Sequence, residues 1–249
     1  MPELTHTITI DALHVFAALL LVCVTLDALT HTKWATALQE DPPRYVAAFA
    51  LIGFALANAA LGGAWQLAAL VTVALVGLHI VVLWLLPEDY KSTLTTFLLT
   101  IATQIAAITA LALHTPNAIA AGIWGQVADL AYAPALIISG GILSVWAGGR
   151  VVGRLTFPFQ DEVVSNSLPN AGRLIGQLER AIIFLLILVQ QPAGVGFLIA
   201  AKSVLRFDTA AQGQKASEYV IIGTLASFAW ALTVSYITVT LLEIATKAP

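Results

Sequence analysis

Residues 172–180 read GRLIGQLER, and the chain continues as AIIFLLILVQQPAGVGFLIAA over 181–201, KSVLRF over 202–207 and ASEYVIIGTL over 216–225. Charged residues crowd the edges of these apolar runs, although only 10% of the 249 residues are charged. Soluble domains carry about 25% charged and about 45–50% apolar residues, whereas this chain is 59% apolar. The composition indicates a polytopic membrane protein.

The remaining composition narrows the function classes. The net charge is −3 and there is no basic tract, so nothing favours nucleic-acid binding. The single cysteine, Cys23, cannot form an intrachain disulfide. No Lys or Arg precedes the first apolar run, which favours a retained first helix over a cleaved signal peptide. Neither an HExxH nor a GxSxG motif occurs, so we predict no catalytic residues, no metal site and no cofactor.

Apolar stretches of the length needed for a membrane span recur along the chain. A span takes about 20 mostly apolar residues, and the lack of water in lipid makes such segments helical. Residues typical of turns, mainly Pro, Gly and Asn, separate the stretches. The expected spans cover residues 9–30, 45–62, 65–86, 92–113, 131–149 and 217–243.

The segment 174–206 fits either one span over 181–201 or two short helices that turn at Pro192. Lys and Arg concentrate in cytoplasmic connections, so their positions distinguish the two arrangements. With a turn, ten of the eleven Lys and Arg residues fall in alternate connections, whereas a single span moves Lys202, Arg206 and Lys215 to the other side. We therefore predict a hairpin at Pro192. Two short crossings and a re-entrant return are equally compatible with it.

These spans predict an all-α fold, a polytopic transmembrane helical bundle of about eight membrane segments including the hairpin. We expect one integral membrane domain over 1–249 with both termini outside. Its parts are a five-helix part (1–149), a cytoplasmic connection (150–172), and a C-terminal charged hairpin with the last helix (173–249).

Polar residues inside apolar segments are the first candidates for function, because an ionisable group there costs about 2.5–3.5 kcal/mol on insertion scales. Asp27 and His31 lie one turn apart on one helix face. They suit a proton or metal pair, or alternatively residues wetted by headgroup water. Deeper in their segments lie His79, Asn58 and Gln104. Hydrogen bonds between helices are the simpler role for these three, and a shared pocket is the alternative.

A second group of candidates lies in the C-terminal third. Lys202 and Arg206 are four residues apart and share a helix face. Snorkelling of long cationic side chains to headgroups accounts for these two and for Arg180. It does not account for Glu179 and Glu218, because acids gain nothing from anionic lipids. We predict that both acids pair with Arg or Lys side chains across helices.

Three strings in this region have specific order and spacing: GRLIGxLER at 172–180, AAKSxxRF at 200–207 and EYxxIGTLxSF at 218–228. Together they resemble a family of bacterial membrane proteins known as domain of unknown function 3307. The N-terminal part is similar more weakly. There the family pattern H-x-x-x-D is matched by Asp27, but Cys23 stands at the position of the His.

Other family positions also differ in this chain. His79 suits a second H-x-x-x-D, but Leu83 replaces its acid, and Gln104 suits a D-Q-x-x-H, but Thr103 and Ala107 replace the outer residues. The resemblance implies a location in the bacterial cytoplasmic (inner) membrane and a shared C-terminal module. The substitutions weigh against a metal-dependent membrane enzyme.

We favour a cytoplasm-facing solute or ion pathway, because several spans, a short hairpin and polar groups at several depths are typical of one. The alternative is a non-catalytic accessory or scaffold subunit of a membrane complex, which glycine-rich helix surfaces favour. Membrane lipids are the expected partners, with other membrane subunits or a homo-oligomer as further candidates. The candidate binding residues are Asp27, His79, Gln104, Glu179, Arg180, Lys202, Arg206 and Glu218.

Overall fold

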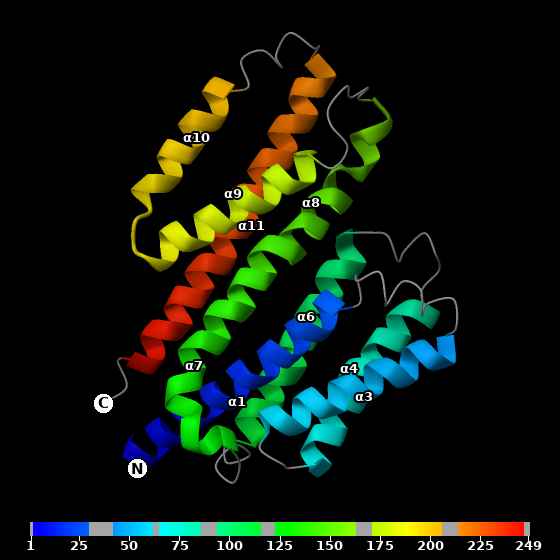
Figure 1. Cartoon of the computed structure of the whole chain (residues 1–249), viewed down its shortest axis with the longest axis vertical. Helices are drawn as coiled ribbons and strands as arrows, with labels where there is room; N and C mark the ends of the chain where they lie inside the picture. The colour runs from blue at the N-terminus through cyan, green and yellow to red at the C-terminus, as the bar shows by residue number, and fades with distance from the viewer. Residues whose placement is uncertain are drawn as a thin grey trace. The chain divides into compact units, whose positions relative to one another are not determined.

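The computed structural model describes most of the chain as helix. The described residues are 2–29, 42–61, 65–85, 94–115, 123–162, 171–205 and 214–246. These residues form helices joined by short turns and contain no β-strand, so the predicted all-α class is confirmed. In chain order the elements are α1 (Pro2–Leu29), α3 (Pro42–Ala60), α4 (Trp65–Leu85), α6 (Leu94–His114), α7 (Ile123–Ile142), η2 (Leu143–Ala147), α8 (Gly148–Thr156), η3 (Phe157–Glu162), α9 (Ala171–Leu188), α10 (Ala193–Leu205) and α11 (Gln214–Thr246) (Figure 1).

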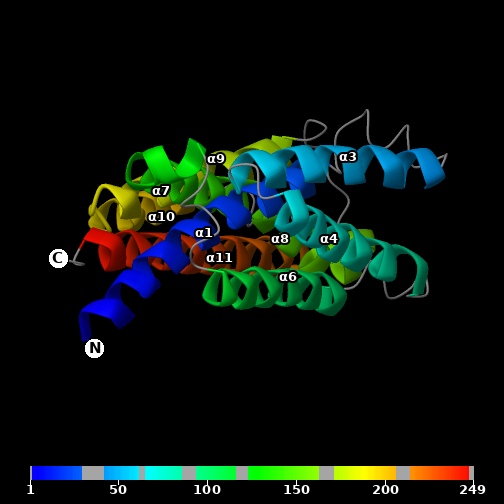
Figure 2. The ribbon, with the colours of Figure 1, turned by 90° about the horizontal axis from the view of Figure 1, so that it is seen from below.

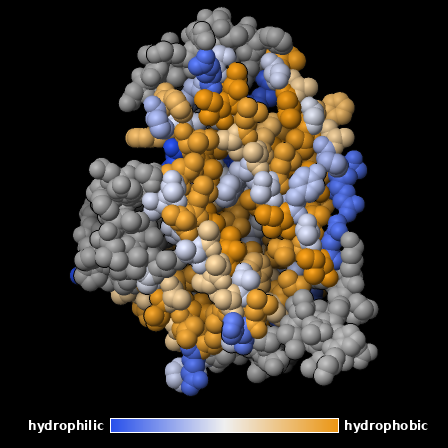
Figure 3. All heavy atoms as spheres, turned by 180° about the vertical axis from the view of Figure 1, so that it is seen from behind, coloured by the Kyte–Doolittle hydropathy of each residue, from blue (hydrophilic) through white to orange (hydrophobic). Residues whose placement is uncertain are grey.

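Four stretches of the described helices are long and apolar enough to cross a membrane. They are Asp11–Leu29, Leu94–His114, Asp129–Phe159 and Ser217–Ile244. Shorter apolar stretches cover Ala47–Ala59, Trp65–Gly77 and Ala193–Val204. Apolar residues also cover much of the face shown in Figure 3, as expected where a surface meets lipid. Length and composition therefore support a membrane protein, and the total of eight segments stays a prediction.

The helix expected over 131–149 is longer than the sequence suggested. Helix α7 starts at Ile123 and runs without a break through the π-helical turn η2 into α8, which ends at Thr156. The predicted connection from residue 150 therefore begins as helix. Glycine and arginine residues are typical of a polar connection, which is why a loop was expected here. In the structure, Val151 and Thr156 are buried, and they hold one face of α8 against its neighbours.

The chain divides into two compact units. Unit 1 contains Met1–Ser139 and Leu242–Pro249, and unit 2 contains Gly140–Leu241, with the boundary inside α7. In unit 1, α1 packs against α3 and α6, and α3 packs against α4 (Figure 1 and Figure 2). The single domain expected over 1–249 stays a prediction.

Helix α1 supplies much of the core of unit 1. Val15 and Leu19 on this helix are completely buried. Threonines within the apolar helices satisfy their hydroxyl groups locally, since Thr25 and Thr72 each donate to the carbonyl oxygen one turn earlier, at 2.6 and 2.8 Å. Such residues need no partner from another helix and indicate no binding site.

Unit 2 contains the hairpin that was predicted at Pro192. Helix α9 ends at Leu188 and α10 begins at Ala193, and Pro192 has no backbone N–H with which to continue a helix. Gln190 has a φ of 58°, in the left-handed region, and this conformation closes the turn. The turn is therefore confirmed (Figure 1).

The short second arm leaves the path of the hairpin open. Helix α10 has 13 residues and spans about 20 Å, less than the about 30 Å of a bilayer core. Two crossings or a re-entrant return both stay predictions. The hairpin packs tightly, because a Cβ atom on Gly194 would lie 2.7 Å from the Leu186 side chain. The apolar core of unit 2 joins α9, α10 and α11 through Ile183, Ile187, Val195, Phe228 and Ala231.

Candidate functional site

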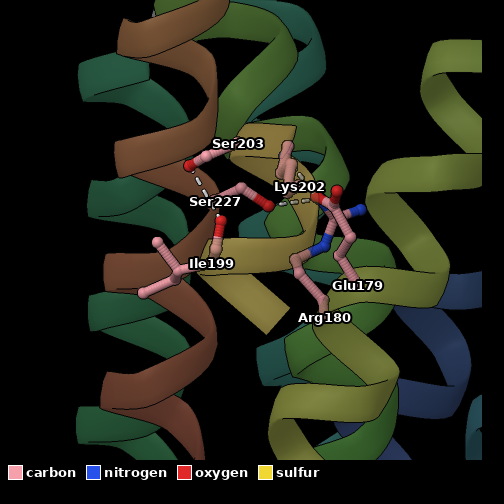
Figure 4. A network of polar contacts seen from close by, with 6 residues as sticks. All are labelled: Glu179, Arg180, Ile199, Lys202, Ser203 and Ser227. Atoms are coloured by element: carbon pink, nitrogen blue, oxygen red, sulfur yellow. Dashed lines mark hydrogen bonds and ion pairs between the residues drawn. The ribbon is translucent and has the colours of Figure 1, made fainter. Parts of the chain in front are cut away.

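Four polar residues come together inside unit 2, and we call them the charged cluster: Glu179, Arg180, Lys202 and Ser227 (Figure 4). Glu179 and Arg180 belong to α9, Lys202 to α10 and Ser227 to α11. Arg180 is only 3% exposed and Glu179 8%, although the surrounding helices are mostly apolar. Burial of charge on this scale requires compensating contacts.

The first of these contacts is an ion pair between α9 and α10. The Lys202 ammonium donates to the Glu179 carboxylate, with 2.5 Å between Nζ and Oε2, and both side chains are nearly buried. Nζ also lies 5.1 Å from the centroid of the Phe228 ring, within range of a cation–π interaction. The prediction that Glu179 pairs with a cation across helices is confirmed.

Arg180 has neutral partners instead. Its Nε and Nη2 donate to the Val145 carbonyl oxygen at 3.2 and 3.0 Å, and Nη1 donates to the Ser227 hydroxyl at 3.0 Å. The role expected for Arg180, snorkelling to headgroups, is wrong. The side chain stays inside because polar acceptors on α11 and on the π-helical turn lie within its reach.

The π-helical turn η2 supplies the backbone acceptor at Val145. A π-turn widens the helix and redirects backbone groups, and such turns occur frequently at functional sites. Here the Leu143 carbonyl accepts a hydrogen bond from Trp230 Nε1 at 2.9 Å, next to the Val145 carbonyl that Arg180 contacts. The turn thereby connects α7 and α8 to α9 and α11 through side-chain hydrogen bonds.

Glycines of α8 allow this close approach. A Cβ atom on Gly148 would lie 2.6 Å from Trp230 Cδ1 and 2.8 Å from Arg180 Cδ. A Cβ on Gly149 would lie 3.1 Å from Arg180 Nη2. The sequence offered one signal for this packing, the glycine-rich end of the fifth predicted span, but nothing that linked it to Arg180.

Replacing Gly148 with alanine is expected to destabilise the protein by about 1–3 kcal/mol, because the added methyl group overpacks a site that two large side chains already fill. Thermal unfolding of the purified protein in mild detergent measures the effect. Gly153→Ala on the same helix is the matched control, since a Cβ there meets nothing within 4 Å. It should leave stability unchanged or raise it by up to about 1 kcal/mol. Equal effects of the two substitutions would contradict the packing described for Gly148.

The other candidate residues do not belong to the charged cluster as the structure describes it, and the side chains of some of them lie outside the described residues. Asp27 on α1 and Gln104 on α6 are half-buried in unit 1, and Glu218 is exposed near the start of α11. The pairing predicted for Glu218 stays a prediction. The side chains of His79 and Arg206 lie outside the described residues, as does His31. Among the described residues, no three His, Cys, Asp or Glu side chains gather as a metal ion would need.

A polar contact in unit 1 between His14 and Asp129 was not predicted from the sequence. His14 Nε2 lies 3.6 Å from an Asp129 carboxylate oxygen, and the His14 ring meets the Tyr132 ring edge to face with 5.3 Å between centroids. The Asp129 side chain is 99% exposed, so solvent or headgroups screen this pair strongly. The charged cluster is the stronger candidate site.

Comparisons of the chain with protein-family models, with curated proteins and with solved structures give no match. The function is therefore inferred from the geometry and charge of the cluster itself.

Proposed function

We propose that the chain forms a membrane pathway for a solute or an ion that opens toward the cytoplasm, with the charged cluster as its polar centre. The observation that supports this most is the burial of Glu179, Arg180 and Lys202 within an apolar helical protein. Charged residues inside membrane proteins are rare, face the protein interior or a water-filled cavity, and mark ion and substrate pathways.

The shape of the hairpin gives independent support. Helix α10 is too short to span a bilayer core, and short or broken helices commonly line the binding sites of transporters. It contacts its neighbours through a narrow face, with Val195 buried, Leu198 and Lys202 half-buried, and most other residues exposed. A helix packed this lightly over buried charges suits a cover that moves when a solute enters.

The second candidate function is an accessory subunit that binds other membrane proteins. The outward faces of the hairpin favour it, because they carry large exposed apolar side chains on both helices. Among the most exposed are Leu174, Leu178 and Leu185 on α9, and Phe197 and Val204 on α10. Lipid or a partner helix would cover these side chains equally well.

A flux assay in reconstituted liposomes separates the two candidates. The full chain is compared with protein-free vesicles for neutral solutes by light scattering and for ions by fluorescent indicators. We expect permeability above background for at least one solute. Lys202→Met should change it by at least about tenfold, because the substitution removes a charge from the polar centre. Arg173→Gln, which alters an exposed cation on α9, should leave flux within about twofold of the wild type.

The same flux assay can also reject the proposed pathway. Protein-free and protein-containing vesicles with the same permeability to every solute and ion would reject the pathway. Co-purification of a stoichiometric membrane partner from the native membrane would then favour the accessory role.

A further inference from the structure

We infer that α10 is a gate that pivots about the turn joining it to α9, and that the ion pair between Lys202 and Glu179 is the latch that holds it closed over the charged cluster. The inference rests on the proposed function and names the element that regulates access to its polar centre. The turn, the narrow contact face of α10 and the place of the ion pair along this helix each support it.

The turn places the pivot at Gln191, because the two backbone groups of this residue bond to different helices. Its N–H donates to the carbonyl oxygen of Leu186 in α9 at 2.7 Å, and its carbonyl oxygen accepts from the N–H of Gly194 in α10 at 3.0 Å. Rotation about φ and ψ of Gln191 therefore tilts α10 relative to α9 and keeps both hydrogen bonds. Hinges in proteins are a few residues at the ends of elements that absorb such a rotation.

Helix α10 packs on the rest of unit 2 along one narrow stripe. Val195 is buried in the apolar core, and Leu198 and Lys202 are half-buried. These three residues are three and four positions apart, so they share one face of the helix. Most other described side chains of α10 are exposed, among them Phe197 and Val204. Because segments with few buried apolar contacts open at a lower cost than the core of a protein, α10 can tilt while the core stays folded.

The ion pair lies far from the pivot, where it opposes a tilt most strongly. Lys202 is about 14 Å along α10 from Ala193, at a rise of about 1.5 Å per residue. Its ammonium contacts Glu179 on α9 and the Phe228 ring on α11, so it ties this end of α10 to both neighbouring helices (Figure 4).

Loss of either charge of the pair favours the tilted position. The charge that remains is nearly buried, which is costly, and a tilt of α10 that lets water reach it lowers the cost. A charged solute that takes the place of one partner opens the latch in the same way.

Distances between two spin labels on the full chain in nanodiscs test the inference. The labels are attached to Ser203→Cys on α10 and Leu225→Cys on α11, two exposed positions, in a chain whose buried Cys23 is replaced by alanine. We expect one distance population in this background. Lys202→Met and Glu179→Gln should each add a second population longer by at least about 5 Å, because a tilt of about 20° moves the far end of α10 by that amount.

Two controls separate opening of the gate from a general loosening of the protein. Phe197→Met introduces the same side chain as Lys202→Met at an exposed position of α10 and should keep the single population. Labels at Leu185→Cys on α9 and Leu225→Cys on α11 should give the same distance in every variant, because these two helices stay packed. Unchanged distances between α10 and α11 in both latch variants overturn the inference, and so does an equal shift between α9 and α11.

The liposome flux assay is independent of these distances. Flux through a protein whose label distances do not respond to the latch variants would retain the pathway and overturn the latch. A longer distance in those variants without flux of any solute would support the pivoting helix and reject the pathway.

Discussion

Replacing Glu179 with methionine is expected to lower the free energy of unfolding by about 3–5 kcal/mol, because the nearly buried Lys202 ammonium loses the carboxylate that it contacts. Methionine preserves most of the side-chain volume, so the loss reports charge rather than packing. Unfolding of the protein by SDS in mixed micelles, followed by tryptophan fluorescence, measures it. Leu178→Met, which introduces the same side chain at an exposed position one residue earlier on α9, is the control and should change stability by no more than about 0.5 kcal/mol.

A double substitution shows whether the loss belongs to the pair. Lys202→Met alone leaves the Glu179 carboxylate without this cation, and the combined variant removes both charges. We expect the double variant to be more stable than the sum of the single losses predicts, by about 1–4 kcal/mol. Strictly additive losses would contradict a direct interaction between the two side chains.

The hairpin and the pairing of Glu179 were predictable from the sequence because each depends on a local property. The turn followed from Pro192 and from the cations placed after residue 201. The pairing followed from an acid at a membrane face where lipids offer it nothing. The identity of the partner was not predictable, since Lys202 lies 23 residues away and reaches Glu179 only because the chain reverses at the turn.

The role of Arg180 was not predictable, for a different reason. Its acceptor is a backbone carbonyl of Val145 in a π-helical turn, and no residue type in the sequence marks such a turn. Gly148 allows the contact, yet a glycine in a membrane helix equally suits a helix end or a contact with another chain. In apolar helices, the faces toward lipid and toward the interior also have the same composition, so the sequence does not show which side is buried.

The position at which α8 ends was also not predictable from the sequence. Arg150 and Arg154 with their neighbouring glycines are typical of a polar connection, and the sequence predicted one from residue 150. The structure continues the helix to Thr156 because packing of Val151 outweighs the weak helix propensity of glycine. Tertiary contacts decide where such a helix ends, and local sequence does not contain them.

Replacing Arg180 with alanine is the second substitution with a large expected effect, a loss of about 2–5 kcal/mol in the free energy of unfolding. The side chain is 3% exposed, so its removal leaves a cavity, and it also removes three hydrogen bonds to Val145 and Ser227. Unfolding by SDS in mixed micelles measures the loss. Arg173→Ala on the exposed part of the same helix is the control, with an expected change of no more than about 0.5 kcal/mol.

Arg180→Lys separates the geometry of the guanidinium from its charge. Lysine keeps the positive charge but lacks the planar group that donates from Nε and Nη2 to one carbonyl oxygen, so we expect an intermediate loss of about 1–3 kcal/mol. A lysine variant as stable as the wild type would show that charge alone suffices and would remove the structural role given to the π-helical turn. An alanine variant no less stable than Arg173→Ala would show that Arg180 does not hold α8, α9 and α11 together. The order expected from the hydrogen bonds is alanine as the least stable variant, lysine next, and the Arg173 control closest to the wild type.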